Sequence, residues 1–207
     1  MKIAVIAANG RSGQAFVEAA LAAGHMVRAG VRGKSHLQPH TNLTVVECDA
    51  TDAVQLRNLL AGQDAVASFI GHVKGSAPDV QTSAIQKVVA AMSELGVKRI
   101  VSLTGTGVRF PGDNISLVDR FLNLSIGIID PARVKDGKNH VDVLKASGLD
   151  WTVIRVLKLQ NTPPRPFALS EHGPTRWYVS RQEVAQAVLQ VLEQHSFIKQ
   201  APIIGKP

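Results

Sequence analysis

The chain has 207 residues, of which 45% are hydrophobic and 19% charged, and its formal net charge is +7. This length suits one sizeable core better than two full domains, and the composition excludes a disordered chain or a coiled coil. The single cysteine, Cys48, excludes an intrachain disulfide and any multi-cysteine metal site. We therefore expect one domain over residues 1–207, without a metal ion.

The positive charge is spread along the sequence instead of being clustered. Basic residues occur from Lys2 to Lys206, with no run longer than Lys98-Arg99, and only 4% of residues are aromatic. Nucleic-acid binding needs a basic patch and stacking platforms, so a small anionic ligand explains the charge more simply. No apolar run approaches the roughly 20 residues of a membrane span, and Met1-Lys2 leads directly into a predicted strand. We expect a cytoplasmic protein with no membrane partner.

Apolar runs alternate with amphipathic stretches over most of the length, which is typical of a parallel sheet covered by helices on both faces. The predicted fold class is therefore α/β with a mainly parallel sheet. The predicted strands are 2–7, 26–31, 43–48, 64–69, 98–103, 151–155 and 200–204. The predicted helices are 12–23, 52–60, 80–95, 132–147 and 181–194.

Two segments, 105–131 and 158–177, interrupt this alternation. The first contains Gly105, Gly107 and a mostly apolar run at its end, and the second contains four prolines. Both follow the carboxyl end of a predicted strand, where open α/β sheets bind their ligands. We expect them to form the walls of a substrate pocket.

The first predicted strand runs into a glycine turn that is followed by a helix. The turn reads Ala7-Ala-Asn-Gly-Arg-Ser-Gly13, which matches the dinucleotide-binding pattern G-x-x-G-x-x-G with alanine in the first position. Unpaired backbone N–H groups at a helix N-terminus attract a diphosphate, and glycine lets it come close. The predicted cradle is residues 9–13: Asn9, Gly10, Arg11, Ser12 and Gly13.

Arg32 ends the second predicted strand, where a dinucleotide fold inspects the adenosine ribose. An acidic residue here would select NAD, whereas arginine offers a fork of donors to the 2′-phosphate of NADP. Arg32, with Lys34 and Ser35 behind it, favours NADP(H) over NAD(H). The alternative interpretation is a solvated basic turn.

The next two strand ends supply further cofactor candidates. Asp49 and Ala50 follow the third strand, where a carboxylate and a backbone N–H can contact an adenine edge; the alternative is that Asp49 only forms a turn. Gly71 and His72 follow the fourth strand, where glycine allows close passage beneath the ribose and a neutral histidine can donate to an oxygen. His72 can equally be a surface histidine.

Ser102 and Thr104 lie at the end of the fifth strand, next to the expected nicotinamide. Alternation along a strand places both hydroxyls on one face. We predict that Thr104 contacts the nicotinamide side, as a cofactor-binding residue and a catalytic candidate.

With these residues in view, the sequence resembles the atypical short-chain dehydrogenase/reductase group, in particular NmrA-like proteins and the flavin reductase/biliverdin-IXβ reductase branch. The resemblance implies a single Rossmann-type, doubly wound domain that binds NADP(H). It is carried by the glycine turn and by Val31-Arg32, Cys48-Asp-Ala-Thr-Asp52, Ser147-Gly-Leu-Asp-Trp-Thr-Val-Ile-Arg155 and Ser180-Arg-Gln-Glu-Val-Ala185.

The resemblance also implies hydride transfer to a flavin, a quinone or a related small acceptor. The Tyr-x-x-x-Lys pair of typical short-chain reductases is missing, because Tyr178 is the only tyrosine and no lysine lies four positions after it. Lys138 lies near the position where related chains keep a lysine, and it is the second catalytic candidate; the alternative is a solvated lysine on a helix surface. We expect Lys158 to line the nicotinamide side. The alternative is a non-catalytic NADP(H) sensor of NmrA-like type.

Overall fold

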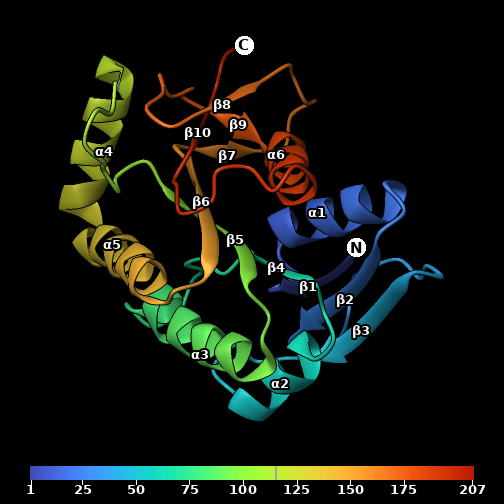
Figure 1. Ribbon diagram of the computed structural model, residues 1–207. Coiled ribbons are helices and arrows are strands. Elements are labelled where there is room, and N and C mark those ends of the chain that lie inside the picture. Colours follow the sequence, from blue (N-terminus) through green and yellow to red (C-terminus); the bar gives the residue numbers. More distant parts are fainter. Residues whose placement is uncertain (115) are drawn as a thin grey trace.

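The structure is a computed structural model that describes residues 1–114 and 116–207. Its main sheet has eight strands in the order β3-β2-β1-β4-β5-β6-β10-β8, and all neighbours are parallel except β8 against β10 (Figure 1). These strands are β1 (Lys2–Ile6), β2 (Met26–Val31), β3 (Leu43–Glu47), β4 (Ala65–Ser68), β5 (Arg99–Gly105), β6 (Asp150–Val156), β8 (Ala168–Ser170) and β10 (Ile203–Gly205). A separate parallel pair consists of β7 (Leu159–Gln160) and β9 (Val179–Ser180).

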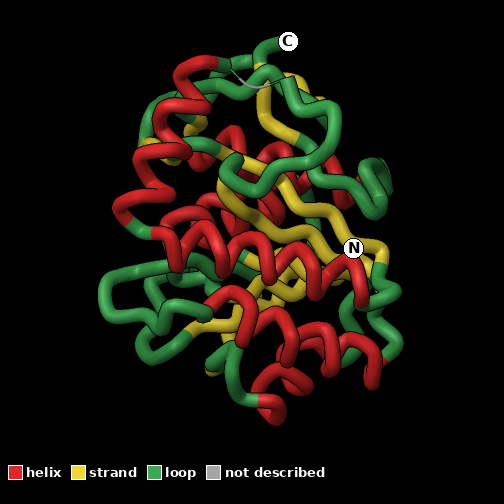
Figure 2. The backbone as a smooth tube through the Cα atoms, turned by 90° about the vertical axis from the view of Figure 1, so that its left-hand side faces the viewer, coloured by secondary structure: helices red, strands yellow, loops and turns green. Residues whose placement is uncertain are grey.

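Helices cover both faces of the sheet, which gives the molecule three layers (Figures 1 and 2). Buried side chains of α1 and α6 form one core against the sheet, and those of α2, α3 and α5 form the other. The helices are α1 (Arg11–Ala22), α2 (Ala53–Leu60), α3 (Val80–Leu95), α4 (Leu117–Ile129), α5 (Pro131–Ala146) and α6 (Arg181–Glu193). No helix in the described ranges is long and apolar enough to cross a membrane.

The central strands are buried on both faces because each carries apolar side chains in succession. In β1 the residues Ile3 to Ile6 are all almost completely buried, with Ile3 in one core and Ile6 in the other. Such continuous apolar strands are stable only between two helical layers. The predicted α/β fold with a mainly parallel sheet is confirmed, and it brings the carboxyl ends of β1, β2, β4, β5 and β6 to one edge.

The five predicted helices and the strands of the parallel sheet are present with boundaries shifted by only a few residues. Segment 105–131, of which residue 115 lies outside the described part, contains the additional helix α4. Its outer side exposes Leu117, Phe121, Leu124 and Ile128. Asp119, on the polar side of α4, is buried, whereas much of the apolar side is exposed. The usual inference that the apolar side of an amphipathic helix faces the core therefore fails for α4. The short strands β7, β8 and β9 were also not predicted.

Candidate cofactor-binding site

The turn between β1 and α1 is shaped by three small residues. Ala7 adopts a left-handed conformation with φ +61°, which glycine occupies more readily than alanine. A Cβ atom on Gly13 would lie 2.5 Å from the carbonyl oxygen of Ala7 and 2.8 Å from the Cα of Ala8. The backbone of α1 therefore begins in contact with the end of β1, and only glycine fits at position 13.

The N-terminus of α1 is not capped by a side chain. The N-cap residue is Gly10, and the first turn contains no acidic residue. By contrast, Asp52, Ser116, Asp130 and Ser180 cap the N-termini of α2, α4, α5 and α6. The first-turn N–H groups of α1, at Arg11, Ser12 and Gly13, are consequently available to an external anion.

Asn9 joins the loop after β2 to the glycine turn. Its amide nitrogen donates to the carbonyl of Lys34 at 2.9 Å, and its amide oxygen accepts from the backbone N–H of His36 at 3.0 Å. Arg32 and Ser35 lie on the same loop, so the structure brings the residues predicted for the 2′-phosphate beside the predicted diphosphate cradle. Arg32 is exposed, and its guanidinium is 3.8 Å from the Asp49 carboxylate.

Asp49 follows β3 next to this loop. Its carboxylate accepts hydrogen bonds from the hydroxyl and backbone N–H of Thr51, and these bonds, with a smaller contribution from Arg32, hold the pKa of Asp49 below its ordinary value. Asp49 therefore forms the turn that the alternative interpretation expected. Its position beside Arg32 also places it next to the residue predicted to bind the 2′-phosphate.

A cavity of about 550 Å³ lies at the carboxyl ends of β4, β5 and β6 and reaches the glycine turn. Ser12, Gly71, His72, Thr104 and Lys158 of the predicted set line it. Much of the remaining lining is apolar and comes from β5, α4, α5 and the end of β6: Leu103, Leu122, Ile126, Val134, Val156 and Leu157. Of the two predicted wall segments, the first supplies Gly105, Gly107, Val108 and three α4 residues, and the second supplies Lys158 and Leu159.

His72 lines the cavity, but one of its ring nitrogens is already engaged. Its Nε2 lies 2.8 Å from Asp136 of α5, whose carboxylate also accepts from the backbone N–H groups of Gln81 and Thr82 and from the Thr82 hydroxyl. Burial raises the pKa of Asp136, but the hydrogen bonds to Thr82, Gln81 and His72 outweigh it and leave the pKa below its ordinary value. Only Nδ1 of His72 remains for a ligand.

The two catalytic candidates lie in different environments. Thr104 is buried at the end of β5 and lines the cavity, and α5 packs so closely that a Cβ on Gly137 would lie 2.8 Å from its hydroxyl. Lys138 is exposed and does not line the cavity. The inner face of α5 is formed by Arg133, Val134 and Gly137, and a residue one position later points about 100° away. We therefore propose no catalytic role for Lys138.

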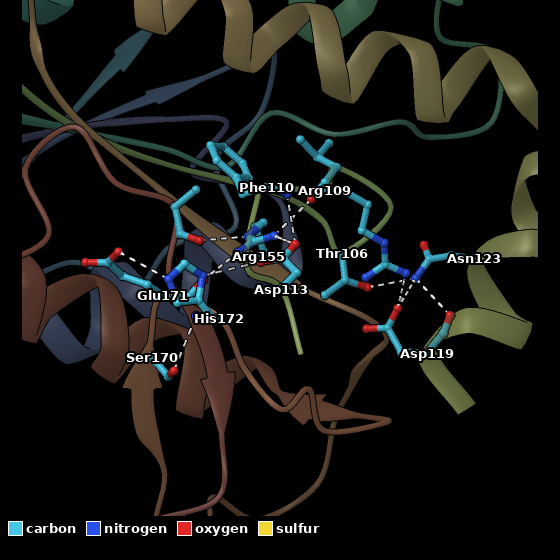
Figure 3. A network of polar contacts seen from close by, with 12 residues as sticks. Thr106, Arg109, Phe110, Asp113, Asp119, Asn123, Arg155, Ser170, Glu171 and His172 are labelled. Carbon is cyan, nitrogen blue, oxygen red and sulfur yellow. Dashed lines mark hydrogen bonds and ion pairs between the residues drawn. The ribbon is translucent and has the colours of Figure 1, made fainter. Parts of the chain in front are cut away.

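Two ion pairs hold the loop that follows β5 (Figure 3). Arg155 is completely buried and donates to both carboxylate oxygens of Asp113, with its other N–H groups bonded to the carbonyls of Val108, Ala201 and Glu171. Arg109 pairs with the buried Asp119 of α4. These contacts fix the cavity wall without filling the cavity.

Sequence reasoning missed two charged residues of the cavity, Arg133 and Arg181. Arg133 lies in the first turn of α5 and pairs with Asp130 at 3.3 Å. Arg181 begins α6, directly after the capping residue Ser180. The capping box identified the start of α6, and a helix that starts at the cavity edge could have drawn attention to Arg181. Nothing in the sequence distinguished Arg133.

The strand order 3-2-1-4-5-6, the glycine turn into an uncapped helix and the cavity at the carboxyl ends of the strands define a Rossmann-type dinucleotide-binding protein. The family described as NAD(P)H-binding matches residues 7–195, and the chain belongs to this family. The predicted membership of an NAD(P)-binding Rossmann family is thus confirmed, as is the prediction that the cofactor is a nicotinamide dinucleotide.

Three proteins illustrate what this chain is similar to. An uncharacterised chloroplastic protein of Arabidopsis thaliana is 28% identical, covering 99% of this chain and 77% of its own length. A short-chain dehydrogenase/reductase of Veillonella parvula, solved in complex with NADP, has a TM-score of 0.83 at 20% identity, with 100% and 94% of the two chains covered. A candidate NADH-flavin reductase of Streptococcus pneumoniae has a TM-score of 0.76 at 23% identity, with both chains fully covered. The cytoplasmic location of this chain stays a prediction.

Proposed function

We propose that this protein is an NADP(H)-dependent oxidoreductase that transfers hydride to a flavin, a quinone or a related small acceptor. The observation that carries the proposal is that Ser12 of the glycine turn, Thr104 and Lys158 line the same cavity of about 550 Å³. A nicotinamide dinucleotide held at the glycine turn would extend along the strand ends into this cavity, next to space for an acceptor.

The residues present fit the cofactor along its length. The first-turn N–H groups of α1 would hold the diphosphate, and the absence of a side chain at Gly13 lets α1 begin directly against the end of β1. Arg32 and Ser35 would hold the 2′-phosphate. Asp49 and Ala50 would contact the adenine. Gly71, where an added Cβ would meet no atom within 4 Å, leaves space for the ribose.

When bound, the nicotinamide supplies the hydride, and the protein contributes position and environment. The Thr104 hydroxyl and the Lys158 ammonium would orient the nicotinamide side or the acceptor carbonyl. Apolar side chains such as Leu103, Ile126 and Val156 exclude water around them. Tyr178 does not line the cavity, so proton delivery by a tyrosine is not part of the proposal. A flavin or quinone can take its proton from solvent after hydride delivery.

The substitution Arg32→Asp tests the assignment of the 2′-phosphate. It replaces the guanidinium donors by a carboxylate, whose negative charge repels the 2′-phosphate. We therefore expect the Kd for NADPH to rise at least about tenfold while the Kd for NADH changes little. Titration of the fluorescence of each reduced nucleotide measures both values. Equal losses for the two nucleotides would remove Arg32 from this role, and a wild-type protein that binds neither nucleotide would refute the proposed function.

The second candidate function is a non-catalytic NADP(H) sensor, which the absence of tyrosine from the described lining of the cavity favours. The two candidates differ in turnover. Purified protein mixed with NADPH and a panel of flavins, quinones and aldehydes should oxidise the nucleotide if it is a reductase. Tight NADPH binding without oxidation by any acceptor would support the sensor instead.

A further inference from the structure

Arg11 and Arg181 come from distant parts of the sequence but begin two neighbouring helices. Arg11 is the first residue of α1, and Arg181 is the first residue of α6, which packs against α1 (Figure 1). Arg181 lines the main cavity and also a second one, again of about 550 Å³, which Arg11 lines as well. Arg181 therefore lies where the two cavities meet, beside the uncapped N-terminus of α1.

Within residues 1–114 and 116–207, neither guanidinium forms an ion pair with a carboxylate. The hydrogen bond that orients Arg181 runs from Nη1 to the neutral Asn161 Oδ1, at 2.6 Å. The nearby buried acid, Glu183, is already engaged by Arg165 and Arg176. Glu18 lines the second cavity without pairing with either arginine. Two cations thus line one cavity, and neither has an ion-pair partner in the described part of the chain.

The surroundings of the pair are polar and incompletely satisfied. Burial lowers the pKa of Arg181, and the positive charge of Arg11 lowers it further, as expected for two guanidiniums close to each other. The Thr162 hydroxyl, which belongs to the lining of the second cavity, is buried without a hydrogen-bond partner among the described residues. A bound anion would relieve the repulsion between the arginines and offer acceptors to these groups.

We propose that Arg11 and Arg181 form a two-arginine clamp for a phosphate group of a bound ligand. The inference rests on the proposed function, because the cavity next to the clamp is the one assigned to the dinucleotide. The phosphate comes either from the dinucleotide diphosphate, held at the adjacent N-terminus of α1, or from a phosphorylated acceptor such as flavin mononucleotide. In both cases the clamp adds charge from α6 to the backbone N–H groups of α1.

The test compares Arg181→Gln with wild type and with Arg57→Gln. Arg57 is an exposed residue of α2 that lines neither cavity and pairs with Glu94, so its substitution removes one positive charge outside both cavities. If the clamp holds the diphosphate, Arg181→Gln raises the Kd for NADPH and for NADH by about tenfold each and reduces the salt dependence of binding. Arg57→Gln leaves both Kd values near wild type. This response differs from that of Arg32→Asp, which is selective for NADPH.

Direct titration of flavin mononucleotide and riboflavin identifies the other source of phosphate. If the clamp holds the acceptor phosphate, Arg181→Gln raises the Kd for flavin mononucleotide but not that for riboflavin. The Kd values for NADPH and NADH then stay unchanged. Unchanged Kd values for all four ligands would overturn the clamp while leaving the proposed function intact, and wild type that binds neither nucleotide would refute the proposed function alone. Arg181→Lys, which keeps the charge, should retain most of the salt dependence, and thermal unfolding checks that each variant is folded.

Discussion

At the scale of single residues, Ala7 pays a conformational cost at the most constrained point of the site. Its φ of +61° is a left-handed conformation that costs an L-residue roughly 1–2 kcal/mol relative to its ordinary conformations. Glycine adopts it freely, although glycine loses more entropy on folding. We therefore expect Ala7→Gly to raise the free energy of unfolding by roughly 1 kcal/mol, measured by urea denaturation.

A matched alanine-to-glycine change should have the opposite sign. Ala90 is exposed in the interior of α3, where glycine lowers stability by about 1 kcal/mol relative to alanine. If both substitutions destabilise the protein, the left-handed conformation of Ala7 carries no net cost that glycine relieves.

The residues that sequence reasoning found are those whose role follows from local spacing. Gly13 was identified from the glycine spacing after the first strand, and Arg32 from its place at the end of the second. In the structure Gly13 lies in the first turn of α1 and Arg32 directly follows β2. Asp136 and Arg181 act through contacts between segments more than 50 residues apart, such as the bond from the Gln81 N–H to Asp136. One sequence without an alignment holds no information about such pairs. Lys138 lies one position after Gly137, which lines the cavity, and the sequence alone could not decide which side of α5 faces the cavity.

At the scale of elements, α3 begins with a cap supplied by another helix. Its own N-cap residue, Asp79, makes no capping hydrogen bond, whereas Asp136 of α5 accepts from the N–H groups of Gln81 and Thr82 at 2.9 Å each. We expect Asp136→Asn to lower the free energy of unfolding by about 2 kcal/mol, because a buried charge-assisted network loses its negative charge and one of its two acceptor oxygens. Asp79→Asn, at an exposed position, should change it by less than about 0.5 kcal/mol.

Hydrogen exchange separates this capping role from a general loss of stability. In Asp136→Asn the amides in the first turn of α3 should exchange faster than those near its C-terminus, because only the N-terminal turn loses its acceptor. Uniform exchange along α3, or equal effects of the two substitutions, would show that Asp136 does not cap the helix.

At the scale of the whole molecule, the two helical layers have different roles. Helices α1 and α6 present their first turns, with Arg11 and Arg181, to the glycine-turn side of the site. On the opposite wall, Asp136 of α5 accepts hydrogen bonds from Gln81 and Thr82 of α3 and contacts His72 of the loop after β4. The presence of the strands and helices, and a mainly parallel sheet, were predictable from the alternation of apolar and amphipathic segments, because that pattern depends on local periodicity. The side-chain contacts between the layers were not predictable, because they depend on which side chains meet in three dimensions.

One such connection makes the stability of the whole fold depend on pH. His140 of α5 is buried against β5, with Nε2 3.1 Å from the Ser102 hydroxyl and Nδ1 without a partner in the described chain. Burial lowers the pKa of His140 from 6.5 to about 4, against a smaller opposing effect of Asp136. Between these values the unfolded chain binds a proton that the folded protein does not, so stability falls as the pH falls.

We expect the free energy of unfolding to decrease by about 2 kcal/mol from this residue between pH 6.5 and pH 4.5, since each pKa unit corresponds to 1.36 kcal/mol. Asp113 and Asp136, whose pKa values lie below their ordinary range, extend the loss in the same direction at lower pH. Urea denaturation of His140→Gln should show a flatter pH dependence over this interval, because glutamine has no proton to gain and can still bond to Ser102. The exposed His36→Gln should retain the wild-type dependence, and an unaltered profile in His140→Gln would assign the pH dependence to other groups.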